Sequence, residues 1–178
     1  MRSRLRASTG AVGFVFLGGP TIVAGIVPWL LTRWHADEQP QALRILGGVL
    51  LLLGATLVIE TTTRFALQGR GTPAPWAPPE LFVVRGSYRL VRNPMYVGVL
   101  ALIAGQGLLL GREILFAWAA AAWLLFHGFV VYEEEPGLRR RFGAEYEDYC
   151  ARVGRWLPSP RSPRYSRRRR GRPARRSQ

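Results

Sequence analysis

Four long apolar runs, separated by short polar segments rich in arginine, constrain the fold of this chain more than any other feature. The runs cover residues 11–31, 43–59, 95–110 and 114–132, and most of the charged residues lie between or beyond them. A helix of about 20 apolar residues is long enough to cross the hydrocarbon core of a bilayer. The sequence therefore predicts an all-α, polytopic membrane protein with four transmembrane helices.

The distribution of arginine predicts the orientation of these helices. The net charge is +14 and arginine supplies all of the positive side-chain charge, because the sequence has no lysine. Arginines cluster before the first run, between the second and third runs, and after the fourth, so four crossings place all three clusters on one side. The positive-inside rule assigns that side to the cytoplasm. We expect an integral protein of a bacterial inner membrane with both termini cytoplasmic.

The last 20 residues have a different composition from the rest of the chain. Residues 159–178 consist mostly of proline, serine and arginine, with almost no apolar side chain. Such a segment lacks the apolar area that would offset the entropy of folding. We predict a membrane domain over residues 1–158 and a disordered tail over 159–178. The tail is expected to contact anionic lipid headgroups rather than nucleic acid.

The third apolar run begins with a helix-start signal. Asn93 is a preferred N-cap residue, and Pro94 fits the first helical position because its missing N–H costs nothing there. Arg92 adds a fixed positive charge beside the free N–H groups of this helix end, which favours an anion such as a carboxylate. Tyr88 and Tyr96 supply aromatic faces that suit a cation. These residues form the first candidate site segment.

Three consecutive acids, Glu133, Glu134 and Glu135, follow the fourth run and lie on the same predicted side as Asn93. Two interpretations remain open for them. They pair with arginines such as Arg92 and Arg139, or they bind a ligand, since a carboxylate accepts hydrogen bonds from a ribose diol and attracts an amino or sulfonium cation.

Beyond the acids, apolar residues recur every three to four positions. They predict one amphipathic helix that covers the site or lies on the membrane and that ends at Trp156-Leu157-Pro158. The members of this apolar face are Leu138, Phe142, Tyr146, Tyr149 and Val153.

Several other site classes are excluded by the sequence. No glycine-rich dinucleotide fingerprint follows a strand, which excludes a soluble Rossmann-type enzyme. Cys150 is the only cysteine, and His35 and His127 lie far apart, so no metal site is expected. His127 is interpreted as a packed or hydrogen-bonded helix residue, and its position at membrane depth keeps a role in a substrate pocket open.

Two separated motifs resemble the isoprenylcysteine carboxyl methyltransferase and phospholipid methyltransferase superfamily, over residues 81–158. The first motif is Gly86-x-Tyr88-x-x-x-Arg92-Asn93-Pro94-x-Tyr96-x-Gly98, and the second runs from Glu133-Glu134-Glu135 through Phe142-Gly143, Tyr146 and Tyr149 to Arg155 and Pro158. The resemblance implies an integral-membrane enzyme that binds S-adenosyl-L-methionine in a cytoplasmic pocket, with an acceptor that enters from the bilayer.

Carried over by position, the resemblance implies a set of cofactor-binding residues: Leu81, Phe82, Val83, Tyr88, Asn93, Pro94, Met95, Tyr96 and Glu134. Tyr96 and Arg92 would position the reactants. This chain departs from the superfamily at three places, one of which is Pro136, which is expected to interrupt a helix that the superfamily tends to continue. Asn93 stands where the superfamily usually has histidine, and Val130 stands where the carboxyl methyltransferases have a substrate-binding arginine.

The function implied by the resemblance is methyl transfer from S-adenosyl-L-methionine to a lipid or lipophilic small molecule at the cytoplasmic face. The alternative is a non-catalytic membrane module on the same scaffold that binds lipid or a partner protein. Binding of the cofactor distinguishes the two functions.

Overall fold

The computed structural model describes residues 18–68 and 84–160, and within these ranges the chain is helical, with an isolated β-bridge between Val91 and Gly154. The predicted site residues 81–83 and nearly all of the predicted tail lie outside the described ranges. The elements in chain order are η1 (Ile22–Ile26), α2 (Val27–Thr32), α3 (Gln41–Gln68), η2 (Gly86–Arg89), α4 (Pro94–Leu110), α5 (Ile114–Phe129), η3 (Val130–Glu134), α6 (Glu135–Phe142) and α7 (Ala144–Arg152).

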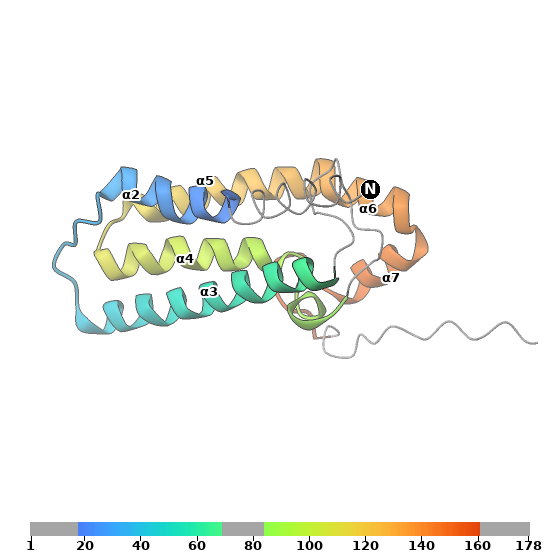
Figure 1. The fold of residues 1–178 in the computed structure, drawn as a ribbon, viewed down its shortest axis with the longest axis horizontal. Coiled ribbons are helices and arrows are strands. Elements are labelled where there is room, and N and C mark those ends of the chain that lie inside the picture. Colours follow the sequence, from blue (N-terminus) through green and yellow to red (C-terminus); the bar gives the residue numbers. More distant parts are fainter. Residues whose placement is uncertain (1–17, 69–83, 161–178) are drawn as a thin grey trace, which may run out of the picture.

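The long helices lie side by side along the long axis of the molecule, and α6 and α7 pack at one end (Figure 1). Two helices, Gln41–Arg64 and Ile114–Phe142, are long and apolar enough to cross a membrane. Two shorter apolar helices, Gly18–Thr32 and Pro94–Leu110, accompany them. The predicted all-α class is therefore confirmed for the part of the chain that the structure describes.

Glycines allow α3 and α4 to approach each other closely. A Cβ atom added to Gly54 on α3 would lie 2.7 Å from the carbonyl oxygen of Gly98 on α4. One added to Gly105 on α4 would lie 2.9 Å from the carbonyl oxygen of Gly47 on α3. Small residues at these positions bring the two backbones into contact, a packing mode common between membrane helices. This contact fixes the start of α4 relative to α3.

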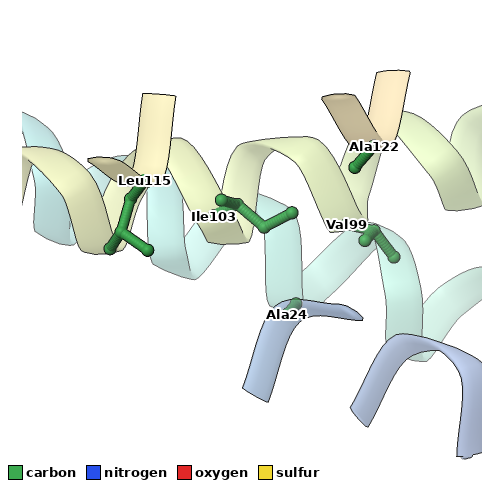
Figure 2. Close-up of a cluster of buried hydrophobic side chains, with 5 residues drawn as sticks. All are labelled: Ala24, Val99, Ile103, Leu115 and Ala122. Atoms are coloured by element: carbon green, nitrogen blue, oxygen red, sulfur yellow. The ribbon is translucent and has the colours of Figure 1, made fainter. Parts of the chain in front are cut away.

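A cluster of buried apolar residues joins α4 to α5 and to the first helix (Figure 2). Its members are Ala24, Val99, Ile103, Leu115 and Ala122. Large apolar side chains also cover the outside of the bundle: Leu52 is 71% exposed, Leu124 63% and Leu125 66%. An apolar exterior on long helices suits a lipid environment rather than water.

The first helix contains a π-turn, η1, whose backbone is completed by side chains from other helices. The N–H of Val27 bonds to the carbonyl of Ile22, and Pro28 has no N–H to donate to the carbonyl of Ala24. Gln106 donates to that carbonyl of Ala24 at 2.7 Å. The indole of Trp118 donates to the carbonyl of Val23 at 2.9 Å. Both donors attach the first helix to the bundle.

The fourth helix is longer than predicted. It was expected to end near Tyr132, but α5, η3 and α6 continue without a break to Phe142. Pro136 lies two residues after the π-turn η3, and the helix continues through it.

The predicted single amphipathic helix is wrong. The structure has two helices, α6 and α7, separated by Gly143, whose φ of 50° and ψ of −125° favour glycine strongly. This turn folds α7 back, and Tyr146, Tyr149 and Val153 form a second apolar core.

Candidate functional site

The two motifs meet through a contact between Tyr96 and Glu134. The hydroxyl of Tyr96 donates a hydrogen bond to Oε2 of Glu134 at 3.4 Å, across 38 residues of sequence. Tyr96 lies in the first turn of α4, and Glu134 is the last residue of η3. The close packing of α4 on α3 and α5 brings these two helix ends together.

The π-turn η3 determines which of the three acids face the protein. In this turn the N–H of Glu135 bonds to the carbonyl of Val130, five residues earlier. Such single π-turns occur frequently at functional sites, because they redirect side chains within an otherwise regular helix. Glu133 is exposed, Glu134 is partly buried, and Glu135 is only 2% exposed.

Tyr88 belongs to the same site. It lies on the 3-10 turn η2, and its carbonyl accepts a hydrogen bond from the hydroxyl of Tyr149 at 2.6 Å. Burial raises the pKa of the Tyr88 hydroxyl well above its usual range, and the nearby Glu134 carboxylate raises it further. The Tyr88 hydroxyl therefore stays protonated, and both tyrosines of the first motif lie near Glu134.

The turn η2 is held in place from α3. The hydroxyl of Ser87 donates to Oε2 of Glu60 at 2.7 Å, and Glu60 also forms an ion pair with Arg64. Two elements distant in sequence, α3 and α7, therefore fix the position of η2 and of Tyr88 on it.

Aromatic side chains surround Tyr96. Its ring stacks on Phe126 of α5, with ring centroids 4.6 Å apart and an interplanar angle of 25°. The indole of Trp156, from the segment after α7, lies 6.3 Å from the Tyr96 ring. Aromatic side chains therefore flank the Tyr96–Glu134 hydrogen bond on the side of Tyr96.

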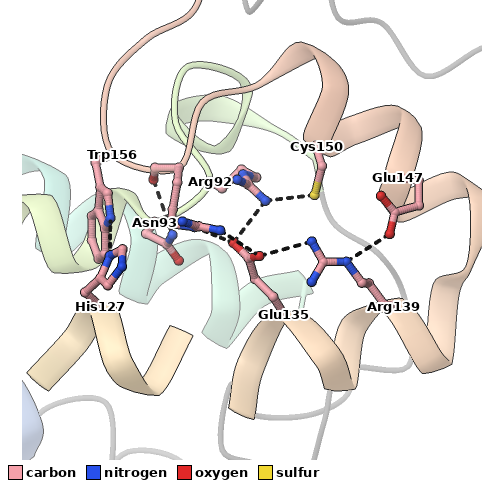
Figure 3. A network of polar contacts seen from close by, with 9 residues as sticks. Arg92, Asn93, His127, Glu135, Arg139, Glu147, Cys150 and Trp156 are labelled. Atoms are coloured by element: carbon pink, nitrogen blue, oxygen red, sulfur yellow. Dashed lines mark hydrogen bonds and ion pairs between the residues drawn. The ribbon is translucent and has the colours of Figure 1, made fainter. Parts of the chain in front are cut away.

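Glu135 is the centre of an arginine network next to this contact (Figure 3). Oε1 of Glu135 lies 3.0 Å from Arg92 and 2.6 Å from Arg155, and Oε2 lies 3.3 Å from Arg139. Only 3% of the Glu135 side chain is exposed. A carboxylate so deeply buried is stable as an anion only because these guanidinium groups compensate it.

Arg92 connects the network to the C-terminal segment. Its guanidinium contacts both Glu135 and Sγ of Cys150, the latter at 2.8 Å, and its backbone N–H donates to the carbonyl of Gly154 at 2.9 Å. One terminal guanidinium nitrogen of Arg92 is therefore engaged by protein groups, whereas its buried Nε has no hydrogen-bond partner among the described residues.

The predicted start of α4 is confirmed, but the predicted side-chain cap is not. Helix α4 begins at Pro94, and Asn93 occupies the N-cap position without a capping hydrogen bond from its side chain. Instead, Nδ2 of Asn93 donates to the carbonyl of Arg155 at 3.3 Å, and Asn93 is 6% exposed. The docked C-terminal segment orients the Asn93 side chain toward Arg155, a partner that the sequence pattern did not reveal. Pro94 is buried and Met95 is partly buried on the first turn.

The structure bears out the pairing interpretation for one of the three acids, and the ligand interpretation stays a prediction. Glu135 pairs with Arg92 and Arg139, as the structural interpretation predicted, and with Arg155 as well. Glu134 forms no ion pair with any described residue, and it contacts Tyr96. Glu134 is therefore the acid that remains available to a ligand.

Sequence reasoning missed the roles of Arg155 and Trp156. Trp156 was interpreted only as part of a helix end, but helix α7 ends at Arg152 and the following segment packs on the site. The available signal was the pairing of a charged and a large aromatic residue directly after an amphipathic helix, where a solvated loop would carry neither.

Metal-ion chemistry has no candidate ligand set in the described ranges: no group of three or more His, Cys, Asp or Glu residues is found there. His127 lies beside Trp156, and His35 lies in the loop after α2. The two histidines therefore belong to different regions of the structure.

The sequence was compared with known proteins. Residues 42–145, more than half of the chain, match the phospholipid methyltransferase family. Over 77 residues the chain is 36% identical to a probable protein-S-isoprenylcysteine O-methyltransferase of Oryza sativa subsp. indica, covering 43% of this chain and 40% of that protein. It is 34% identical over 77 residues to protein-S-isoprenylcysteine O-methyltransferase B of Arabidopsis thaliana, covering 43% of this chain and 39% of that protein. The matched segment thus spans less than half the length of these curated relatives. The family match and the predicted motifs agree, and the chain belongs to the phospholipid methyltransferase family.

Proposed function

We propose that this protein transfers a methyl group from S-adenosyl-L-methionine to a lipid or lipophilic small molecule at the cytoplasmic face of a membrane. The observation that carries the proposal is the hydrogen bond between Tyr96 and Glu134, because it joins the two separated motifs of a methyltransferase family. The names of the relatives in rice and Arabidopsis, both isoprenylcysteine O-methyltransferases, support the same reaction class.

The described residues fit this cofactor. Its sulfonium and amino groups are cationic, and Glu134 provides a carboxylate that forms no ion pair within the described ranges, next to the rings of Tyr88 and Tyr96. The carboxylate of the cofactor suits the N-terminus of α4, where Pro94 and Met95 begin a 17-residue helix. Leu81, Phe82 and Val83 would line the adenosine side, and they lie outside the described residues.

The protein needs no nucleophile of its own for this reaction. The bound cofactor supplies a methyl group that is already activated on a sulfonium centre. The residues of the site then serve to orient the reactants and to exclude water. Tyr96 is well suited to this task, because its ring is fixed by Phe126 and its hydroxyl by Glu134.

We also propose four membrane crossings with both termini in the cytoplasm. Helix α4 has 17 residues, a length of about 25 Å at 1.5 Å per residue, which is slightly less than the hydrocarbon core. The site lies at the end of the bundle that carries Arg85, Arg89 and Arg92, the side that the positive-inside rule assigns to the cytoplasm. On this arrangement the arginine tail faces anionic headgroups of a bacterial inner membrane.

Calorimetry with S-adenosylhomocysteine and detergent-purified protein tests cofactor binding. We expect Glu134→Gln to weaken binding about 10- to 100-fold, as for the loss of a charge-assisted hydrogen bond, and Tyr96→Phe to weaken it a few-fold. The matched controls are Glu133→Gln and Tyr132→Phe, since Glu133 and Tyr132 are exposed neighbours of the same chemistry. Absence of binding by the parent protein would overturn the proposal.

Transfer is tested separately with isotopically labelled cofactor and vesicles prepared from a bacterial lipid extract. Label recovered in the extractable lipid fraction, and lost in Glu134→Gln, is the expected result. Binding of cofactor without label in any lipid or added lipophilic acceptor would favour the non-catalytic module.

A further inference from the structure

His127 and Trp156 form a hydrogen-bonded pair that the proposed cofactor site does not use. The indole N–H of Trp156 donates to Nδ1 of His127 at 3.2 Å (Figure 3). His127 lies near the end of α5, Trp156 lies in the segment after α7, and both side chains are partly buried. Polar groups among apolar side chains cost free energy unless they are hydrogen-bonded, so the partners of His127 need to be identified.

The pair determines where His127 carries its proton. An indole nitrogen is a donor only, so Nδ1 of His127 must supply the accepting lone pair. The proton of the neutral ring then lies on Nε2, and among the described residues none is hydrogen-bonded to Nε2. His127 therefore presents a hydrogen-bond donor, and its one lone pair is engaged by Trp156.

The pair lies within an aromatic cluster that reaches from the outside of the bundle to Tyr96. The ring of Trp123 is 5.2 Å from His127 and 6.4 Å from Trp156, and Trp156 is 6.3 Å from Tyr96. Trp123 is 38% exposed, next to the strongly exposed Leu124 on the apolar exterior of α5. At the other end, the hydroxyl of Tyr96 contacts Glu134.

We infer that Trp123, His127 and Trp156 form the binding site for the reacting end of the methyl acceptor, with the Nε2–H of His127 donating a hydrogen bond to it. This inference rests on the proposed function. The cluster offers an aromatic surface that begins at the lipid-facing side of α5, a single polar donor, and a ring next to Tyr96 of the cofactor site.

The direction of this hydrogen bond selects the chemical class of acceptor. A carboxylate or phenolate oxygen accepts a hydrogen bond, whereas an ammonium group only donates. Oxygen then forms the new bond to the methyl carbon, the carbon–sulfur bond breaks, and its electron pair stays on sulfur, so no proton is released. An ammonium acceptor must first lose a proton, and the lone pair of His127 is already occupied. The site is therefore assigned to a lipophilic oxygen acid rather than to an aminophospholipid.

Three probes test this assignment with labelled cofactor: N-acetyl-S-farnesylcysteine, a long-chain fatty acid, and phosphatidylethanolamine in vesicles. We expect label in at least one of the two oxygen acids and at least about tenfold less in phosphatidylethanolamine. Preferential labelling of phosphatidylethanolamine, or no label in either oxygen acid by a protein that binds S-adenosylhomocysteine, would overturn the inference. Failure of the parent protein to bind S-adenosylhomocysteine would instead overturn the proposed function.

Variants of His127 test the residue itself. His127→Phe keeps an aromatic ring but removes the donor, so kcat/KM for the labelled acceptor should fall about tenfold or more while S-adenosylhomocysteine affinity stays within about twofold. His127→Gln retains one acceptor and one donor and should restore most of the activity. Leu124→Ala, on the lipid-facing side of the same helix, is the control and should leave kcat/KM unchanged.

A purely structural role for His127 makes a different prediction. In that case both His127→Phe and His127→Gln would lower S-adenosylhomocysteine affinity and acceptor turnover together. That result, or an unchanged kcat/KM in His127→Phe, would overturn the role assigned to His127.

Discussion

Arg155 binds both carboxylate oxygens of Glu135, with Nε of Arg155 2.6 Å from Oε1 and its second guanidinium nitrogen 3.0 Å from Oε2. Glu135 directly follows Glu134, and Arg155 directly precedes Trp156. This one bidentate ion pair therefore fixes the residue next to each candidate ligand-binding group. The ion pair therefore keeps Glu134, on the proposed cofactor side, at a constant distance from Trp156, on the proposed acceptor side.

Removing the charge of Glu135 is expected to destabilise the fold strongly. Glu135→Gln leaves Arg92 and Arg155 without their shared anion, and the side chain of Arg92 is only 12% exposed. Breaking a buried ion pair from one side typically costs about 3–5 kcal/mol. The measurement is unfolding of the detergent-solubilised protein followed by circular dichroism.

The control for this prediction is Glu147→Gln. Glu147 pairs with Arg139 on the surface, where its side chain is 58% exposed, so its loss should cost less than about 1 kcal/mol. Equal shifts in the two variants would contradict a central role for Glu135.

The packing of α3 on α4 gives a second prediction, based on two glycines of the same helix. In Gly54→Ala the new Cβ atom would lie 2.7 Å from a backbone oxygen of α4, so the helices must separate. Overpacking of this kind costs about 1–3 kcal/mol. In Gly48→Ala the new Cβ meets nothing within 4 Å, and the higher helix propensity of alanine should be neutral or stabilising by up to about 1 kcal/mol. Thermal unfolding of both variants in detergent provides the comparison.

Features encoded by local sequence were predictable. The start of α4 at Pro94 follows from the steric preference of proline for a first turn, and Gly98 and Gly105 share one helix face by their spacing alone. Assigning Tyr96 and Glu134 to the same side required only the order of apolar runs and the charge asymmetry. These properties depend on residues within one helix or on the composition of whole segments.

Features that depend on long-range contacts were not predictable. The apolar spacing of α6 and α7 continues through Gly143, so periodicity gave no sign of the turn, which depends on the backbone freedom of a single glycine. Asn93 was expected to cap its own helix, but its side chain bonds to Arg155, 62 residues away. Local patterns do not specify whether a side chain bonds to its own helix end or to a partner that a distant segment supplies.

The only cysteine provides a probe of the arginine network. Burial raises the pKa of the Cys150 thiol, although the neighbouring Arg92 acts in the opposite direction. A raised pKa means a smaller thiolate fraction at neutral pH, so maleimide labelling should be slow in the folded protein and fast in sodium dodecyl sulfate. The folded-state rate should keep rising to higher pH than the rate of the unfolded chain. Intact-protein mass spectrometry measures both rates, and equal rates would show that Cys150 is not buried against Arg92.

The π-turn η1 gives the last prediction, because two side chains from other helices complete its backbone hydrogen bonding. Gln106→Leu removes the donor to the carbonyl of Ala24, and Pro28 cannot replace it. Hydrogen bonds between membrane helices contribute about 0.6 kcal/mol on average and up to about 1.7 kcal/mol. We expect destabilisation near the upper value, since Pro28, four residues after Ala24, has no N–H to replace the lost donor.

Trp118→Phe, which removes the donor to Val23, should act in the same direction. The double variant should cost less than the sum of the two single variants, because the loss of either donor already loosens the same π-turn. Thr56→Val is the control: Thr56 is exposed and bonds only to Leu52 of its own helix, so its removal should change stability by less than about 0.5 kcal/mol. Additive losses in the double variant would show that the two donors act on independent parts of the first helix.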